Sequence, residues 1–189
     1  MDAKVHALLN QQINKEFYSA YLYLDFSNYF KAKGLDGFAN WYMIQAQEER
    51  DHALLFMKYM QNNGLKVTLD MIGKPDKVYN ELMDPLVASA EHERYVTSLI
   101  NEIYHEAHEN KDYRTMKFLD WFIEEQGEEE EKADRIMGNV FALLISTSMI
   151  LLAFCYIFRK PILYLFGASD ASYVFANQYL QIYLLGTPF

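Results

Sequence analysis

The chain has 189 residues, a net charge of −9 and a pI near 5.0, which is enough length for one domain with a sizeable core. The charge is uneven, because the residues after Gly138 carry a net +1 and residues 1–138 therefore carry −10. A strongly acidic first part argues against nucleic acid as a partner and favours cations.

Two features bear on the cellular compartment. Cys155 is the only cysteine, so an intrachain disulfide is excluded. The opening sequence MDAKVHALLNQQINKE has no apolar stretch of the kind that a signal peptide carries. We therefore expect a cytoplasmic first part.

Apolar periodicity predicts four long helices in the first 138 residues. They cover about residues 3–31, 35–62, 85–110 and 112 onward. The first and third connections are short and make antiparallel hairpins, whereas about 20 residues with Gly73 and Pro75 separate the second helix from the third. This pattern predicts an all-α antiparallel four-helix bundle with one long crossover.

Each predicted helix has a core-facing stripe that is apolar at both ends and carries a carboxylate near its middle, on Glu16, Glu49, Glu93 and Glu129. Steps of three and four residues keep each stripe on one face. Burial of an uncompensated carboxylate costs about several kcal/mol, and no lysine or arginine lies on the stripes. Bound cations are the compensation that we expect. The stripes are Leu9, Ile13, Glu16, Ala20, Tyr23, Ser27 and Phe30; Phe38, Tyr42, Gln45, Glu49, His52, Phe56 and Tyr59; Leu86, Ala90, Glu93, Thr97, Ile100, Tyr104 and Ala107; and Leu119, Phe122, Gln126, Glu129, Ala133 and Ile136.

The types of ligand side chain indicate which cations would bind. Glu49 and His52 are three residues apart and point at one site, and Gln126 adds an amide oxygen. Oxygen donors with one imidazole favour iron, manganese or a loosely selective divalent site over a thiolate zinc site. Four carboxylates balance two divalent ions, with Glu49 as the economical bridge.

The same glutamates can also be interpreted without a bound metal. A single glutamate on a helix stripe is usually a boundary residue, and EEQGEEEE also fits a solvated acidic face. The coincidence of one acidic layer in each of four helices favours a metal site. The other histidines are expected on the surface, and they are His6, His92, His105 and His108.

At these residues the chain resembles the bacterial non-haem ferritins. The resemblance covers about residues 1–137 and includes LNQQINKEFYSAYLYLDFSNYF, GFANWYMIQAQEERDHALLFMKYM, EHERYVTSLINEIYHEAHENKDYRT and FLDWFIEEQGEEEEKADRI. It implies a ferritin-like di-iron domain. On the core-facing stripes Glu-x-x-His occurs once, and Glu129 stands where bacterioferritin would have a second histidine, which favours the non-haem branch.

The resemblance implies roles for particular residues. Glu16, Glu49 and His52 would hold the first iron, and Glu49, Glu93 and Glu129 the second, with Gln126 close by. Glu48, Glu125 and Glu128 match a third iron site, and Tyr23 matches a tyrosine that supplies an electron. The implied function is iron storage: a ferroxidase that oxidises Fe(II) with O2 or hydrogen peroxide and deposits ferric mineral inside a 24-subunit homo-oligomer.

The last part of the chain has a different character. Residues 140–158 contain no charge and would make about 28 Å of helix, which is long enough to cross a bilayer. A buried core helix is the alternative, but the run is apolar on every face. Arg159 and Lys160 end it. We expect one transmembrane-like helix in a hydrophobic helical tail, and possible membrane contact through it.

Residues 138–189, and above all KPILYLFGASDASYVFANQYLQIYLLGTPF, resemble the multidrug and toxic compound extrusion (MATE) transporters. Those proteins have about twelve spans, and the tail lacks an intramembrane charge that would couple transport. We therefore expect no transport activity. Two further hypotheses remain open: a membrane-anchored iron-binding module without a cage, and a chimeric or truncated product whose tail derives from a multidrug efflux transporter. The altered C-terminus also leaves open whether the 24-subunit cage assembles.

Overall fold

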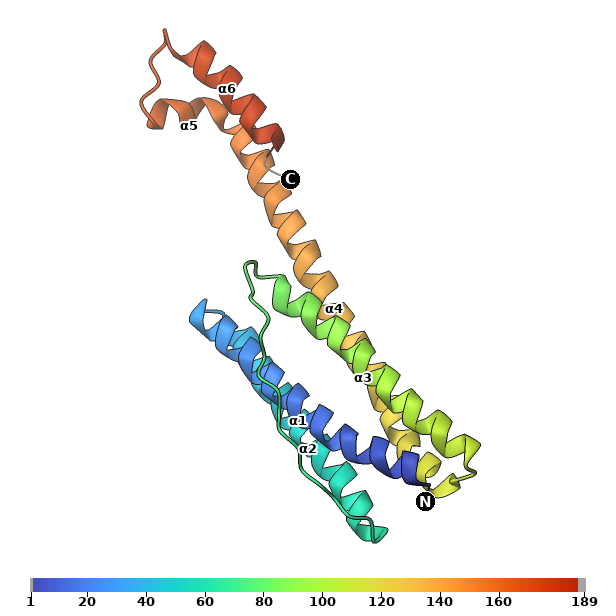
Figure 1. The fold of residues 1–189 in the computed structure, drawn as a ribbon. Helices are drawn as coiled ribbons and strands as arrows, with labels where there is room; N and C mark the ends of the chain where they lie inside the picture. The colour runs from blue at the N-terminus through green and yellow to red at the C-terminus, as the bar shows by residue number, and fades with distance from the viewer. Residues whose placement is uncertain (1, 187–189) are drawn as a thin grey trace. The chain divides into compact units, whose positions relative to one another are not determined.

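The computed structural model describes residues 2–186, which form helices joined by turns and one long coil (Figure 1). The chain divides into two compact units, Met1–Arg135 and Ile136–Phe189. The first contains four long helices, as predicted, and the second contains the rest of the fourth helix and two shorter ones. The helices are α1 (Ala3–Ala32), α2 (Asp36–Asn62), α3 (Asp84–Glu109), α4 (Tyr113–Ile157), α5 (Arg159–Leu165) and α6 (Tyr173–Gly186).

Glycines end the first two helices. Gly34 and Gly64 have φ of +74° and +68°, a left-handed conformation that costs glycine little. At each end the next residue donates its N–H to a carbonyl five positions back, Leu35 to Phe30 and Leu65 to Met60, at 3.0 and 2.9 Å. These bonds cap the C-termini of the helices, because they satisfy backbone carbonyls that have no partner within the helix. The tight turn after Gly34 lets α2 run back antiparallel to α1.

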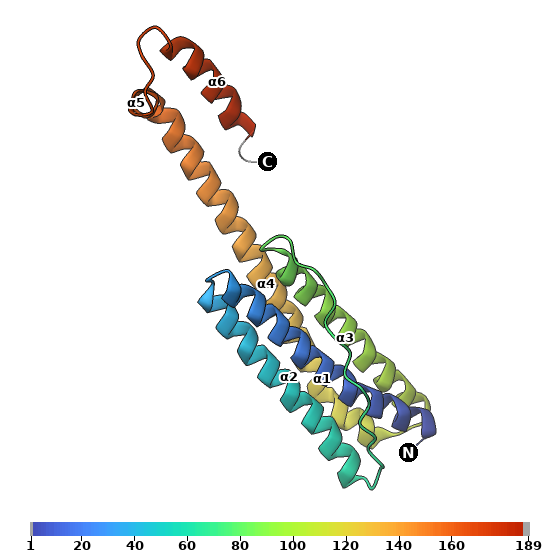
Figure 2. The same ribbon diagram turned by 60° about the vertical axis from the view of Figure 1, so that its left-hand side comes forward.

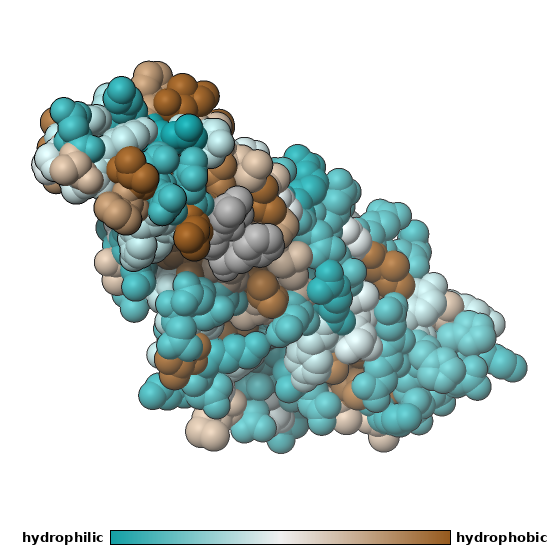
Figure 3. Space-filling model, turned by 90° about the horizontal axis from the view of Figure 1, so that it is seen from above, coloured by the Kyte–Doolittle hydropathy of each residue, from teal (hydrophilic) through white to brown (hydrophobic). Residues whose placement is uncertain are grey.

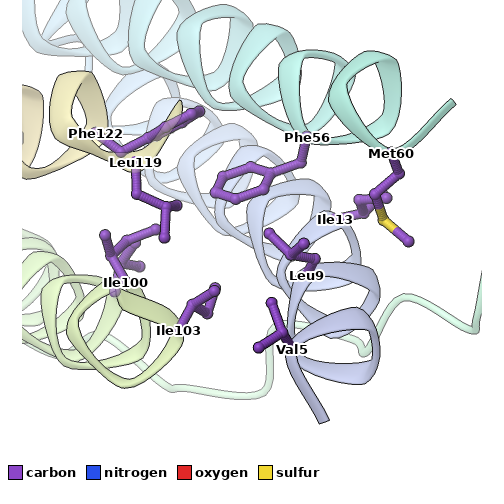
Figure 4. Packing of buried hydrophobic residues seen from close by; sticks show 10 residues of the cluster. Val5, Leu9, Ile13, Phe56, Met60, Ile100, Ile103, Leu119 and Phe122 are labelled. Carbon is purple, nitrogen blue, oxygen red and sulfur yellow. The ribbon is translucent and has the colours of Figure 1, made fainter. Parts of the chain in front are cut away.

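The apolar core of the bundle takes side chains from all four helices. In Figure 4, α1 and α2 face α3 and α4 across it, and Phe56 lies near the middle. All of these side chains are at most 1 % exposed. The cluster is Val5, Leu9, Ile13, Phe56, Met60, Val96, Ile100, Ile103, Leu119 and Phe122. Because every stripe contributes to one core, the antiparallel bundle predicted from the sequence is confirmed.

The long crossover between α2 and α3 runs along α1, as both ribbon views show (Figures 1 and 2). Three polar side chains at four-residue spacing on α1 bind its backbone. His6 Nε2 lies 2.9 Å from the Lys66 carbonyl, Asn10 donates to the Thr68 carbonyl at 2.8 Å, and Asn14 donates to the Met71 carbonyl at 3.0 Å. Thr68 also donates its N–H to Asn10 Oδ1 at 2.8 Å. This ladder positions a segment that has no regular structure of its own.

In the second unit the apolar run is helical and exposed. An 18-residue window of α4 is apolar enough to cross a membrane, and none of it is buried within the structure. Cys155 lies in this run and is partly exposed. The guanidinium of Arg159 lies 4.6 Å from the centre of the Tyr156 ring, so the end of the run is a pair of basic and aromatic side chains. By contrast, Figure 3 shows hydrophilic residues over most of the bundle's visible face.

Candidate metal centre

The interior of the bundle contains a carboxylate–histidine cluster. Glu16 on α1 and Glu49 and His52 on α2 each present one ligand atom, and these atoms lie within 4.8 Å of one another. Within residues 2–186 this is the only such group of three or more. His52 Nδ1 lies 3.8 Å from Glu49 Oε2, as one helical turn between them allows.

The Glu16 carboxylate is incompletely satisfied. Its Oε1 accepts a hydrogen bond from Gln12 at 2.8 Å, whereas its buried Oε2 has no partner. Burial, followed by repulsion from Glu49, raises the pKa of Glu16 well above its ordinary value. Burial likewise raises the pKa of Glu49 to about 8. A cation at this point would supply the missing partner and offset the burial of both carboxylates, so the donor set fits a divalent metal ion.

Glu93 on α3 lies in a neighbouring network. It accepts a hydrogen bond from the hydroxyl of Tyr23, and Gln126 on α4 donates to its Oε2 at 3.3 Å. Burial is the main cause that raises the pKa of Glu93 to about 8, and the charge of Glu129 adds to it. Gln126 also lies 3.4 Å from Thr97 Oγ1. Tyr23 therefore contacts a carboxylate that the resemblance to non-haem ferritins assigned to the second iron.

Glu129 on α4 is held by two donors. Gln45 on α2 donates to its Oε2 and the Lys132 ammonium donates to its Oε1, both at 2.8 Å. Although no basic residue lies on the stripes, a basic residue next to the fourth stripe does reach Glu129. Lys132 lies beside the stripe, and its long side chain brings a positive charge to the four buried glutamates of the stripes. These four residues, here called the acidic layer, are Glu16, Glu49, Glu93 and Glu129.

The residues matched to a third iron site lie on a more open surface. Glu48 and Glu128 are exposed and Glu125 is partly buried. Glu125 Oε1 lies 4.0 Å from the Lys132 ammonium. These three glutamates do not form a group of ligand atoms within 4.8 Å in the part of the chain that the structure describes.

His92 differs from the surface position that the sequence suggested. It is partly buried, its Nε2 lies 2.7 Å from Ser19 Oγ, and its ring meets that of Tyr23 edge-on at 6.0 Å. Ser19 already donates to the Lys15 carbonyl at 3.1 Å, so Nε2 is the donor to Ser19. Burial lowers the pKa of His92 to about 4, and its imidazole is neutral at neutral pH.

The sequence analysis placed Gln45 on a core-facing stripe without giving it a role, and it missed Gln12. Gln12 and Gln45 are buried and bind Glu16 and Glu129 respectively. Each lies on the same helix face as a layer glutamate, four residues before Glu16 and Glu49, and that spacing was a usable signal. Lys132 offered a weaker signal, its position three residues after Glu129.

The fold and this cluster define a four-helix-bundle protein with carboxylate and histidine donors in its interior. Residues 6–141 match the family model described as Ferritin-like domain. The chain therefore belongs to the ferritin family. A second model, MatE, matches residues 127–189, so the chain joins a ferritin-like bundle to a segment similar to another family.

Individual relatives agree with this assignment. The chain is 36 % identical over 140 residues to a probable bacterial non-heme ferritin-like protein of Haemophilus influenzae, covering 74 % of this chain and 85 % of that protein. It is 37 % identical over 130 residues to the bacterial non-heme ferritin of Campylobacter jejuni, covering 69 % and 78 %. Among solved structures, an open-pore ferritin from Archaeoglobus fulgidus superimposes with a TM-score of 0.74 at 37 % identity, covering 76 % of this chain and 88 % of that one.

Proposed function

We propose that the chain is an iron-storage ferritin whose bundle oxidises Fe(II) at a pair of buried positions and passes Fe(III) to a mineral. Residues 1–137 are the di-iron domain in this proposal, and residues 138–189 are a hydrophobic segment without transport activity. The overlap of the two family matches, residues 127–141, supports a boundary near residue 138.

The observation that carries the proposal is the buried cluster of Glu16, Glu49 and His52 with its unpartnered Oε2. A bundle core does not retain uncompensated carboxylates without a cost in stability, and Fe(II) is a substrate whose charge and ligand preference match them. In the proposal these residues bind the first Fe(II), and Glu49 is shared with a second Fe(II) held by Glu93 and Glu129.

The chemistry follows from binding two ions together. Each Fe(II) gives one electron, so a pair reduces one O2 to hydrogen peroxide with two protons, or one hydrogen peroxide to two waters with two protons. The protein positions both ions so that one oxidant meets two electrons. Tyr23, whose hydroxyl donates to Glu93, is the residue we assign to supply a further electron.

The test adds Fe(II) without oxygen to the full chain in a mild detergent, admits air and follows ferric absorbance. A Glu49→Ala/His52→Ala variant is expected to lose about 100-fold or more of the initial rate, because the first position loses two of its three ligands. The chain offers a matched control in Glu102→Ala/His105→Ala, which removes a pair with the same spacing from exposed positions on α3.

The control is expected to oxidise Fe(II) as the parent does. A parent-like rate in the Glu49→Ala/His52→Ala variant would sink the proposal. A loss in both variants would point to a general effect of removing carboxylates from α2 and α3.

A second candidate is a membrane-anchored iron-binding module without a cage, and the exposed apolar window of α4 is the observation that favours it. An uncharged run of this length leaves water for lipid if no protein covers it. Fractionation of cells that express the full chain separates the two candidates. A soluble particle of 24 subunits supports the storage cage, whereas a membrane fraction released only by detergent supports the anchored module.

A further inference from the structure

The Glu129 carboxylate has both of its oxygens engaged. Lys132 donates to Oε1 and Gln45 to Oε2, each at 2.8 Å. The Glu129 side chain is 3 % exposed, whereas that of Lys132 is 42 % exposed, so the lysine stem lies at the surface and the ammonium reaches a buried carboxylate. A charged donor makes the stronger of these two bonds.

The ammonium also faces the neighbouring acidic groups. Its nitrogen lies 4.0 Å from Glu125 Oε1. The hydrogen bond to Glu129 is the main cause that raises the pKa of Lys132, and the charges of Glu125 and Glu48 add to it. Among the ion pairs of the described residues, Lys132 is the only lysine or arginine that contacts Glu125 or Glu129. It is therefore a resident cation among the carboxylates assigned to the second and third iron positions.

The first position is different. Glu16, Glu49 and His52 come from α1 and α2, and none of them contacts Lys132 in the structure. A divalent ion can enter there without moving a lysine. An ion that uses Glu129 or Glu125 has to share the carboxylate with the ammonium or displace it, and two cations on one carboxylate repel each other.

We propose that Lys132 is a specificity-determining residue of the iron site: its ammonium competes with metal ions for Glu129 and Glu125. The inference rests on the proposed function and adds the order in which the metal positions fill. The first position fills at low metal concentration, and the second and third fill only when the metal ion outcompetes the lysine. Charge, rather than the shape of the side chain, is the property of Lys132 that produces this order.

The test uses Co(II) as the probe, because it takes oxygen and imidazole ligands and can be followed by visible absorption and by titration calorimetry. The full chain in a mild detergent is titrated as parent, Lys132→Met, Lys132→Gln and Lys132→Arg. Removal of the charge in the Met and Gln variants is expected to tighten the second and third binding steps about tenfold and to leave the first step unchanged. The Arg variant keeps the charge and should bind Co(II) as the parent does.

A matched control comes from the same helix. Lys117 pairs with Asp120 at 3.3 Å, and the two residues are three positions apart on α4, as Lys132 and Glu129 are. Asp120 is not one of the carboxylates assigned to an iron position. Lys117→Met should therefore leave all binding steps unchanged. Circular dichroism and thermal unfolding of each variant establish that the bundle is intact, and the Gln variant replaces the Met variant if the latter fails to fold.

The outcomes separate this inference from the proposed function. If Lys132→Met and Lys132→Gln give the parent's titration curve while Glu49→Ala/His52→Ala abolishes the first step, the competition is refuted and the iron site stands. If the Arg variant behaves like the Met variant, charge is not the cause and the inference is overturned. If the parent and Glu49→Ala/His52→Ala bind Co(II) equally, the proposed function and the inference both fail.

Discussion

At the scale of single residues, burial of the four glutamates of the acidic layer costs electrostatic free energy. Glu16, Glu49, Glu93 and Glu129 are all at most 2 % exposed, so they belong to the core rather than to its boundary. Their hydrogen bonds come from glutamine amides, a tyrosine hydroxyl and one lysine, with no arginine. The amides and the hydroxyl carry no charge, and the lysine balances one carboxylate at most, which leaves room for the charge of bound cations.

This arrangement predicts how the stability of the metal-free chain depends on pH. Burial raises the pKa of Glu49 and of Glu93 to about 8, from 4.5. Between these values the unfolded state has lost protons that the folded state keeps, so the stability from these groups is present below pH 4.5 and falls as the pH rises to 8. We expect the unfolding temperature to fall over this window, with each group contributing at most about 1.4 kcal/mol per pH unit.

Thermal unfolding in chelator measures the effect, and Glu49→Gln is the comparison because it removes one titrating group and retains the shape. Its unfolding temperature should depend less steeply on pH than that of the parent. If the unfolding temperatures of the two proteins depend on pH equally steeply, the raised pKa of Glu49 is contradicted. His92, whose pKa is lowered to about 4, acts in the opposite direction below pH 6.5 and is common to both proteins.

At the scale of elements, the crossover between α2 and α3 depends on the side chains of α1. Asn10 makes two hydrogen bonds with Thr68, both at 2.8 Å, and is the middle step of the ladder. Asn10→Ala removes both bonds and should cost about 1 to 2 kcal/mol of local stability. We expect protease to cut the crossover faster in this variant, as measured by limited proteolysis and mass spectrometry.

The neighbouring Gln11 provides the control, since it is exposed on the same helix. Gln11→Ala should be cut at the parent's rate. If Asn10→Ala is also cut at that rate, the ladder is not what holds the crossover against α1.

The helices and the crossover also show what could be read from sequence. Periodicity predicted the bundle because a helix brings every third or fourth side chain to one face, and every layer glutamate lies on such a face. The path of the crossover could not be predicted, because α1 binds its backbone carbonyls, which every residue has. The contact of Lys132 with Glu129 was missed for another reason: a flexible side chain can reach a site that its own face does not point to.

At the scale of the whole molecule, the chain combines two units with different surfaces. The bundle core ends on α4 at Ala133, the last buried residue of that helix, and the apolar window beyond it contributes nothing buried. We therefore expect a chain that stops after Gly138 to keep the unfolding free energy of the bundle within about 1 kcal/mol. Denaturant unfolding followed by circular dichroism measures this.

The same truncated chain should stay in solution without detergent, because the exposed apolar run is absent. A bundle that unfolds much more readily after truncation would show that the tail supports it. A truncated chain that still sediments with membranes would place the membrane contact in the bundle.

The sole thiol gives the tail a chemical reporter of its own. Cys155 lies within the apolar run and the bundle contains no other cysteine, so any maleimide that reacts with the chain marks the tail alone. A charged maleimide reaches a thiol in water and is excluded from hydrocarbon, whereas an apolar one enters both. The ratio of the two labelling rates, measured on broken cells that retain their membranes, distinguishes a tail in lipid from a tail in water.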